Sequence, residues 1–341
     1  MKVSVIGIGK MGLLHAGIMN NLENVKLTAI SDTSKMLLSF TKNLKKDVGV
    51  YDNYVKMLDK ERPDLTVITT PVFLHVPMAQ ECVKRNIPFF VEKPLSPFST
   101  DAAEMVETID QKNLTTAVGY MMRYVETFAK AKEIIDSGVL GRLINFRSTI
   151  YVAQLFRKGK GWRYDKKESG GGVVIGQATH LIDLMKWYFG PVEMVSAHTK
   201  NFYSEEVEDF AHAHFEFKSG VTGWLDSSWS MRHHRLLEIV IEVNAENGNL
   251  TVSDDEVKFF LDKPANGTAA GWTHFARPDL FEGVEIDLGG PQYTRQDVQF
   301  IEAVKSGGQV SNDVRSAYEV QKIVDAVYMS ADKHGAPVKV L

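Results

Sequence analysis

The segment Gly7-Ile8-Gly9-Lys10-Met11-Gly12 constrains the fold more than any other part of the sequence. It follows a short apolar run at residues 3–7 and precedes residues 11–22, where apolar side chains recur at helical spacing. In such a turn the first glycine allows the sharp bend, the second lets the backbone approach a pyrophosphate, and the third lets helix and strand pack closely. Free N–H groups at the helix start then favour phosphate. The motif predicts a dinucleotide-binding turn.

An acidic residue stands where a ribose would be recognised. Asp32 ends the second expected strand, twenty residues after Gly12. A carboxylate there can accept hydrogen bonds from both ribose hydroxyls and repels a 2′-phosphate, so we expect NAD and disfavour NADP. The neighbours Ser34 and Lys35 leave some tolerance of NADP open.

Strand and helix patterns alternate through the first 122 residues, as a parallel sheet requires. We expect six strands; residues 3–7, 26–31 and 65–70 are three of them, residues 88–91 the fifth and residues 115–119 the sixth. The expected helices span residues 11–22, 34–44, 52–58, 76–85 and 100–111. Right-handed crossovers then predict an N-terminal Rossmann domain, an α/β doubly wound parallel sheet, over residues 1–122.

Residues 123–341 have a different pattern. Alternating polarity predicts strands at residues 143–152, 193–199, 209–217, 223–228 and 236–243, with a pair within 249–261. Helices are expected at residues 127–137, 180–188, 295–305 and 314–331, and residues 264–291 as a long surface excursion. This predicts a C-terminal α/β domain with a large open, mostly antiparallel sheet. An uncovered sheet face favours a homo-oligomer, a dimer or tetramer formed through that sheet.

Bulk composition excludes several classes of protein. The 341 residues are 44% hydrophobic and 24% charged, which is typical of a globular chain with two domains. A net charge of -4 gives no general attraction to nucleic acid or to an anionic membrane. The single cysteine, Cys82, excludes an internal disulfide. Because the chain begins a strand at once, we expect no signal peptide, and with no long apolar run we expect a cytoplasmic protein.

A lysine follows the fifth expected strand in Glu92-Lys93-Pro94. The carboxyl ends of parallel strands are where open α/β sheets bind ligands. Lys93 could hydrogen-bond a substrate hydroxyl and help to move its proton while hydride leaves the carbon. An ordinary surface lysine after a strand explains the spacing equally well.

Several motifs in the same order resemble the Gfo/Idh/MocA family of glucose–fructose oxidoreductases and inositol dehydrogenases. They are the glycine turn, Thr70-Pro71 followed by His75, Glu92-Lys93-Pro94, Gly138 to Arg142, and Gly170-Gly171-Gly172 with His180-Leu181-Ile182-Asp183. The resemblance implies an NAD-dependent oxidoreductase acting on a sugar, nucleotide-linked sugar or polyol. It places Lys93 and His180 in the family's catalytic positions. It also adds Thr70, Pro71, His75, Glu92 and Lys93 to the cofactor contacts.

His180 suits a general base for a secondary alcohol because the pKa of imidazole lies near neutrality. A histidine at the start of an apolar helix is, without the resemblance, more often a packed structural residue. This sequence departs from the family in two places: Gly176 stands where many members have an aspartate, and Val72 where they have an asparagine after the Thr-Pro pair. With Gly176, Lys93 could carry more of the proton transfer and His180 could polarise the substrate.

Five further residues are candidates for shaping the substrate pocket, and packing or solvation explains each of them as well. They are Arg123, Tyr151, Trp162, Arg163 and Gln177. An arginine beside an aromatic residue suits a sugar that bears a carboxylate or phosphate. His212, His214, His233 and His234 lack ligands at metal-binding spacing, so no metal site is expected.

Three alternatives to an NAD-dependent dehydrogenase remain open from the sequence. An NADPH-dependent keto-sugar reductase would share the fold, although Asp32 disfavours it. A non-catalytic NAD-binding sensor is expected to lose Lys93 or His180, and both are present. An NAD-dependent glycoside hydrolase, known as one branch of the family, has no specific signal here.

Overall fold

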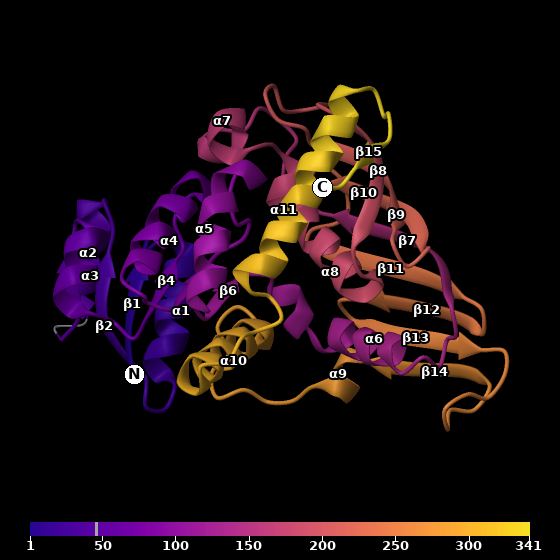
Figure 1. Cartoon of the computed structure of the whole chain (residues 1–341), viewed down its shortest axis with the longest axis horizontal. Coiled ribbons are helices and arrows are strands. Elements are labelled where there is room, and N and C mark those ends of the chain that lie inside the picture. The colour runs from indigo at the N-terminus through magenta and orange to yellow at the C-terminus, as the bar shows by residue number, and fades with distance from the viewer. Residues whose placement is uncertain (45–46) are drawn as a thin grey trace. The chain divides into compact units, whose positions relative to one another are not determined.

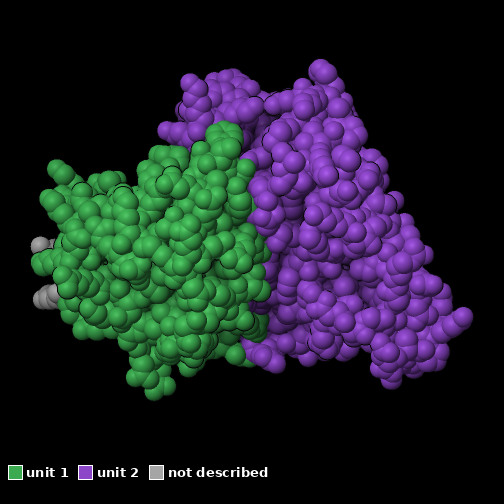
Figure 2. Space-filling model, viewed as in Figure 1, with its two compact units in different colours: residues 1–121, 283–318 green, residues 122–282, 319–341 purple. Residues whose placement is uncertain are grey.

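The structure, a computed structural model, describes residues 1–44 and 47–341. The chain divides into two compact units (Figure 2). The first comprises residues 1–121 and 283–318, and the second residues 122–282 and 319–341. The sequence patterns predict a domain boundary after residue 122, with residues 283–318 in the C-terminal domain. In the structure this segment packs in the first unit.

The first unit is built on a six-stranded parallel sheet (Figure 1). Its strands lie in the order β3-β2-β1-β4-β5-β6, the order of a Rossmann fold. The bounds are β1 Lys2–Ile6, β2 Lys26–Ser31, β3 Gly49–Tyr51, β4 Leu65–Ile68, β5 Phe89–Val91 and β6 Thr116–Val118. β3 is the third of the six expected strands and the one without an expected range. It has three residues, all of them half-buried, and a strand this short shows no apolar pattern in the sequence.

Helices connect these strands as right-handed crossovers require. They are α1 Lys10–Asn21, α2 Lys35–Leu44, α3 Tyr54–Glu61, α4 His75–Lys84 and α5 Ser99–Lys112, with a short 3₁₀ turn at Val72–Leu74 before α4. Side-chain packing is described for α2 only up to residue 39. The predicted Rossmann domain is confirmed.

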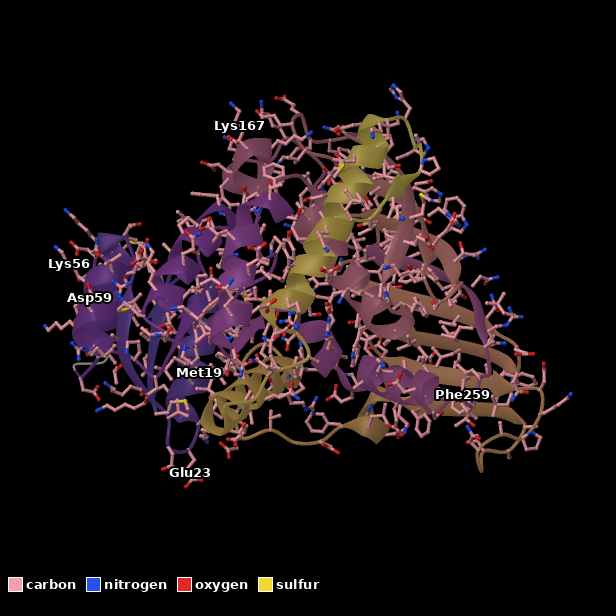
Figure 3. The ribbon with its side chains drawn as sticks, viewed as in Figure 1. Met19, Glu23, Lys56, Asp59, Lys167 and Phe259 are labelled. Carbon is pink, nitrogen blue, oxygen red and sulfur yellow. The ribbon has the colours of Figure 1, made fainter. Side chains whose placement is uncertain are left out.

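Helix α10, Pro291–Ser306, explains why a late segment joins the first unit. Its buried Phe300 and Ile301 belong to the same apolar core as Ile18 and Met19 of α1. Figure 3 shows Met19 beside α10. An amphipathic pattern predicts that a helix has an apolar face, but not which partner covers that face.

The second unit is built on a nine-stranded mixed sheet, ordered β14-β13-β12-β11-β7-β10-β9-β8-β15. Its strands are β7 Leu143–Tyr151, β8 Val192–Lys200, β9 Phe210–Phe217, β10 Thr222–Ser228, β11 Glu238–Ala245, β12 Gly248–Ser253, β13 Glu256–Leu261, β14 Gly271–Ala276 and β15 Val338–Lys339. β7 and β10 run parallel, and the other neighbours run antiparallel. The predicted mostly antiparallel sheet is confirmed.

Helices cover one face of this sheet. They are α6 Glu126–Asp136, α8 Thr179–Phe189 and α11 Val314–Asp332. The chain also has the short helix α7 Lys166–Ser169, the 3₁₀ turns Met121–Tyr124 and Trp162–Tyr164, and the π-helical turn Val174–Ala178. The buried Phe259 of β13 (Figure 3) lies on a strand that packs against α6. Val314 to Tyr318, the first residues of α11, pack with the first unit and the rest with the second.

The prediction that residues 264–291 form a surface excursion is wrong in part. Residues 264–291 contain an edge strand, β14, and a short helix, α9 Arg277–Leu280, instead of one irregular excursion. β14 pairs with β13 at the edge of the sheet, and its Trp272 and His274 face outward. A short edge strand with one exposed face has a weak apolar pattern, and glycines near it add to the appearance of a loop. The sequence therefore does not reveal this strand.

Candidate active site

The glycine turn adopts the geometry that a dinucleotide needs. Gly7 has a φ of +89°, which side chains other than glycine rarely adopt. A Cβ on Gly12 would lie 1.9 Å from the Gly7 carbonyl oxygen, so only glycine lets α1 start this close to β1. A Cβ on Gly9 would meet no atom within 4 Å, so this backbone is open to a ligand. No side chain caps the start of α1. Lys10 and Met11 form its first turn.

Asp32 is held beside this turn by two backbone N–H groups. Its Oδ2 accepts from Ile8 N–H at 2.7 Å, and its Oδ1 accepts from Ser34 N–H at 2.7 Å. Each carboxylate oxygen keeps a lone pair for a further donor. The half-buried carboxylate is therefore held in one orientation and can accept further hydrogen bonds from a ligand.

The loop after β4 is tied to the glycine turn and to the loop after β5. Thr69 Oγ1 donates to the Gly7 carbonyl at 2.7 Å. His75 Nε2 lies 2.9 Å from the Thr70 carbonyl oxygen, and His75 Nδ1 lies 2.8 Å from the Pro94 carbonyl oxygen. Burial lowers the pKa of His75, so the neutral ring donates to one of these acceptors at a time. His75 is buried and connects the loop that carries Pro71 to the loop that carries Pro94.

Glu92 and Lys93 follow β5 at the carboxyl edge of the sheet. Glu92 Oε2 accepts the backbone N–H of Lys93 at 3.2 Å, and its Oε1 lies 3.0 Å from Nε2 of His15. Nδ1 of His15 in turn lies 2.9 Å from Oδ2 of Asp297. Sequence reasoning missed His15 and Asp297. His15 could have been found, because it lies three residues after Gly12 on the inner face of a helix. Asp297 lies 282 residues away, and nothing in the sequence marks it as a partner of His15.

The candidate base His180 lies at the start of α8, directly after a turn of π-helix at Val174–Ala178. Glu208 holds the chain that leads into this turn. Its carboxylate accepts the N–H groups of Gly172 and Val174, each at 2.9 Å, and the hydroxyl of Tyr328 at 2.8 Å. Burial raises the pKa of Glu208, although these donors oppose the shift.

The glycines before His180 are required by close packing. A Cβ on Gly171 would lie 2.0 Å from the Tyr328 hydroxyl, and one on Gly172 would lie 1.9 Å from the Glu208 carbonyl oxygen. The sequence marks this segment only as a glycine run. In the structure, Glu208 and Tyr328 pack so closely on this segment that they leave no room for side chains. They also hold the backbone that leads to His180.

Arg123 is engaged by Asp183, which lies three residues after His180. Its Nε donates to Asp183 Oδ2 at 2.8 Å, and Nη2 donates to the other oxygen. The two side chains are 4% and 0% exposed, so this ion pair is buried within the second unit. The Arg123 guanidinium also lies over the Trp187 ring, 5.6 Å from its centroid.

The other four substrate candidates lie in three places. Gln177 belongs to the π-helical turn and is buried, and Tyr151 ends β7 with its ring against His234. Burial raises the pKa of Tyr151. Trp162 and Arg163 share a short turn, with the Arg163 guanidinium 4.6 Å from the Trp162 ring centroid.

Tyr164 connects this turn to the residues near His180. The Tyr164 ring packs on the indole of Trp229 at 5.8 Å between centroids. The indole in turn lies against Gly176, where a Cβ would be 3.3 Å from its Cζ3 atom. Tyr164 and Trp229 were not among the predicted site residues; aromatic residues outside any motif give no signal of their own.

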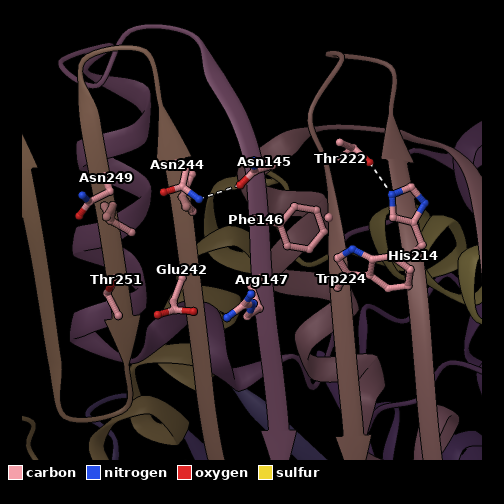
Figure 4. A pocket seen from close by; sticks show the side chains of 13 residues that line it. Asn145, Phe146, Arg147, His214, Thr222, Trp224, Glu242, Asn244, Asn249 and Thr251 are labelled. Atoms are coloured by element: carbon pink, nitrogen blue, oxygen red, sulfur yellow. Dashed lines mark hydrogen bonds between the residues drawn. The ribbon is translucent and has the colours of Figure 1, made fainter.

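The outer face of the nine-stranded sheet carries a hollow of about 520 Å³ (Figure 4). Arg147, Glu242, His214 and Trp224 are among the residues that line it. His214 Nε2 lies 2.7 Å from Thr222 Oγ1, and His212 pairs with Asp226. Among residues 1–44 and 47–341, no group of three potential ligands could hold a metal ion. Over the same residues, no helix is both long and apolar enough to cross a membrane.

The strand order and the glycine turn define a protein of the class that binds a dinucleotide on a Rossmann domain. Residues 1–120 match the model of an oxidoreductase family with an NAD-binding Rossmann fold, and residues 128–251 match the GFO/IDH/MocA C-terminal domain. The chain belongs to the Gfo/Idh/MocA family of NAD-dependent oxidoreductases. The predicted family, cofactor and enzyme class are confirmed.

Relatives of known activity match most of the chain. Levoglucosan dehydrogenase of Pseudarthrobacter phenanthrenivorans is 25% identical over 310 residues, covering 80% of this chain and 79% of that protein. Myo-inositol 2-dehydrogenase of Thermotoga maritima is 27% identical over 237 residues, covering 67% and 68%. A solved structure of levoglucosan dehydrogenase with NADH and levoglucosan has the same fold, with a TM-score of 0.88 at 21% identity over 100% of this chain and 99% of that one.

Proposed function

We propose that this protein is a dehydrogenase that reversibly oxidises a secondary hydroxyl of a cyclic sugar, nucleotide-linked sugar or polyol. The observation that carries the proposal is the position of Lys93, directly after β5 and held by Glu92, on a Rossmann sheet whose Asp32 is oriented for ribose. The substrate class is supported by the relatives, which are named as dehydrogenases of levoglucosan and inositol.

The proton and the hydride of the alcohol have different destinations in this proposal. NAD, when held by the glycine turn and Asp32, would supply the hydride acceptor for the carbinol carbon. His180 accepts the hydroxyl proton as general base, and Lys93 hydrogen-bonds the same oxygen and shares the proton transfer. The products are a ketone, NADH and a proton, and the reverse reaction returns the proton from His180. No aspartate lies at Gly176 to orient His180, so Lys93 carries more of this step.

Buried donors near His180 support an oxygen-rich substrate. Gln177 Nε2 and Trp229 Nε1 are both buried, and neither has a hydrogen-bond acceptor among the described residues. A buried N–H without an acceptor costs about 1–3 kcal/mol. Hydroxyl oxygens of a sugar or polyol would supply the acceptors and offset this cost. Trp162 and Arg163, next to Tyr164, and Tyr151 stay candidates for the wall of the substrate site, whereas Arg123 has a positioning role through Asp183.

The test combines cofactor binding with turnover. NADH and NADPH are titrated separately against the purified protein by nicotinamide fluorescence, and NADH formation is followed with sugars, polyols and nucleotide sugars. Lys93→Met should bind NADH but lose turnover by about 10²–10⁴-fold. Lys26→Met, an exposed lysine at the amino end of β2, is the matched control and should keep both.

Each outcome of this test has a definite meaning. Turnover of one substrate class that disappears in Lys93→Met supports the proposal. Tighter binding of NADPH than of NADH would favour the keto-sugar reductase. Cofactor binding without turnover of any substrate would favour a sensor.

We also propose that the outer face of the nine-stranded sheet joins copies of this chain into a homo-oligomer. Large aromatic side chains are exposed there, with Trp224 45% and Trp272 63% exposed. Exposed aromatic residues on a sheet face favour association. Light scattering on the protein and on Trp224→Lys tests this: the wild type should be a dimer or tetramer and the variant should dissociate, whereas a monomeric wild type would refute it.

A further inference from the structure

Three charged side chains are buried together in the first unit. The imidazole of His15, fully buried, lies between two carboxylates: Asp297 at 2.9 Å from Nδ1 and Glu92 at 3.0 Å from Nε2. The Asp297 side chain is 0% exposed and that of Glu92 is 13% exposed. We call these residues the His15 triad. The proposed proton transfer at Lys93 and His180 uses none of its three side chains directly.

The geometry determines the protonation of His15. Ionised carboxylates only accept hydrogen bonds, so both ring nitrogens must carry hydrogen for both contacts to be hydrogen bonds. Burial alone would lower the pKa of His15, but Asp297 and then Glu92 outweigh it and raise that pKa to about 10. Burial also raises the pKa of Asp297, and the positive charge of His15 opposes this shift.

Two aromatic rings that pack on His15 supply no charge. The Phe90 ring from β5 lies 4.8 Å from the imidazole centroid, and the Tyr293 ring from α10 lies 6.3 Å away. Burial, followed by the nearby charge of Glu92, raises the pKa of Tyr293 to about 12, so this phenol is neutral. With His15 as a cation, the triad has a net charge of -1.

The triad joins two parts of the cofactor site. His15 lies on α1, three residues after Gly12 of the glycine turn. At the other end, Glu92 Oε2 accepts the backbone N–H of Lys93. Gly119 closes over the same carboxylate, since a Cβ there would lie 2.8 Å from Oε2. The Glu92 carboxylate therefore has one position, and the Lys93 backbone follows it.

We propose that His15 is a positioning residue for Lys93: as a buried cation it joins Asp297 to Glu92 and so fixes the carboxylate that holds the Lys93 backbone. The inference rests on the proposed function only in taking Lys93 as catalytic. Placement of a reacting group matters because a displacement of about 1 Å can cost about a hundredfold in rate.

Two measurements test the triad without a substrate. In ¹⁵N-histidine-labelled protein, the His15 signal, assigned by its loss in His15→Gln, should show two protonated ring nitrogens at pH 8. Hydrogen exchange of the peptide that contains the Lys93 amide should be faster in Asp297→Asn, an isosteric change that removes the distant charge. Asp64→Asn is the matched control, because Asp64 binds the Lys2 N–H at the amino edge of the same sheet and should leave this peptide unchanged.

A third measurement relates the triad to the reaction. With an identified substrate, Asp297→Asn should lower kcat about tenfold or more while the dissociation constant of NADH changes less than about twofold. As the pH rises, the variant should lose activity at a lower pH than the wild type does. The reason is that without Asp297 only Glu92 stabilises the His15 imidazolium. A role confined to global stability would move the unfolding midpoint but neither this pH limb nor the local exchange.

The outcomes separate the two proposals. A singly protonated His15 at pH 8, or unchanged exchange at Lys93 in a folded Asp297→Asn protein, would overturn the triad even if the dehydrogenase is active. If Asp297→Asn does not fold, the protonation of His15 in the wild type still decides whether the triad proposal holds. If the protein turns over no substrate, the proposed function fails while the exchange and protonation results stand.

Discussion

The indole of Trp229 packs against Gly176: a Cβ built on this glycine would lie 3.3 Å from Cζ3 of the ring. A contact of that length requires the ring to give way by a few tenths of an ångström. Gly176 itself is exposed and lies about one helical turn before His180. The position where many relatives of this family carry an aspartate is thus bordered by an aromatic ring.

Gly176→Asp should change the pH dependence of the reaction. A carboxylate near His180 would favour the imidazolium over the neutral imidazole. Because the base acts when neutral, the rising limb of kcat/KM against pH should move to higher pH. Gly176→Asn, which has the same size and no charge, should leave the limb in place. Both variants should lose about 1 kcal/mol of stability to the contact with Trp229. If kcat/KM of the two variants depends on pH in the same way, the rising limb does not report the protonation of His180.

Asp32 should determine the choice of cofactor. In Asp32→Asn, one oxygen remains for a backbone N–H, but the charge that repels a 2′-phosphate is gone. We expect NADH to bind about tenfold more weakly and NADPH more tightly, so the ratio of the two dissociation constants should approach one. Fluorescence titrations at one salt concentration measure this ratio. Wild-type protein that binds both cofactors equally would contradict the role given to Asp32.

The ion pair of Arg123 and Asp183 should support the helix of His180. Asp183→Asn leaves a buried guanidinium without its counter-ion, which should cost about 3–5 kcal/mol in the free energy of unfolding. Asp136→Asn, which breaks the exposed pair with Lys132 on α6, should cost no more than about 1 kcal/mol. Urea unfolding of both variants gives the comparison. Equal costs would mean that the Arg123 pair is not buried in solution.

The buried carboxyl of Asp254 should make stability depend on pH. Burial raises the pKa of Asp254 to about 6, opposed by the N–H of Ile239 at 2.9 Å. The folded state therefore keeps a proton that the unfolded state loses above about pH 4. This stabilisation is complete below about pH 4 and is lost by about pH 6 to 7.

Asp254→Asn removes this dependence. Its free energy of unfolding relative to wild type should rise by about 2 kcal/mol between pH 4 and pH 7. Urea unfolding at several pH values measures it, with Asp262→Asn, an exposed aspartate, as the control. A relative stability that stays flat across this range would show that the Asp254 carboxyl is solvated.

Local patterns in the sequence predicted the Rossmann unit well, because its turns and strands are determined by residues that are close together in the chain. Gly7 needs a positive φ and Gly12 a close approach, and both needs arise within one turn of chain. The strand at Lys26–Ser31 has the predicted bounds. The catalytic assignment of Lys93 and His180, by contrast, came from the family resemblance and stays a proposal.

The site around these residues was predicted only in part. Gln177 and His75 were named, but the groups that hold the site were not: His15 and Asp297 behind Lys93, and Glu208 before His180. Each of these is a common polar residue, His15 and Asp297 in helices and Glu208 in the loop before β9. Nothing in its neighbours marks it as buried and paired.

The sequence by itself determined the class of fold, the cofactor turn and the family, because backbone conformation and hydrophobic periodicity depend on residues close together in the chain. Only the tertiary structure decided that α10 returns to the first unit, that Asp297 meets His15 across 282 residues, and that Trp229 lies against Gly176. These contacts depend on which apolar faces cover one another and where buried charges find partners. That choice is made by the packing of the whole chain, so no local pattern records it.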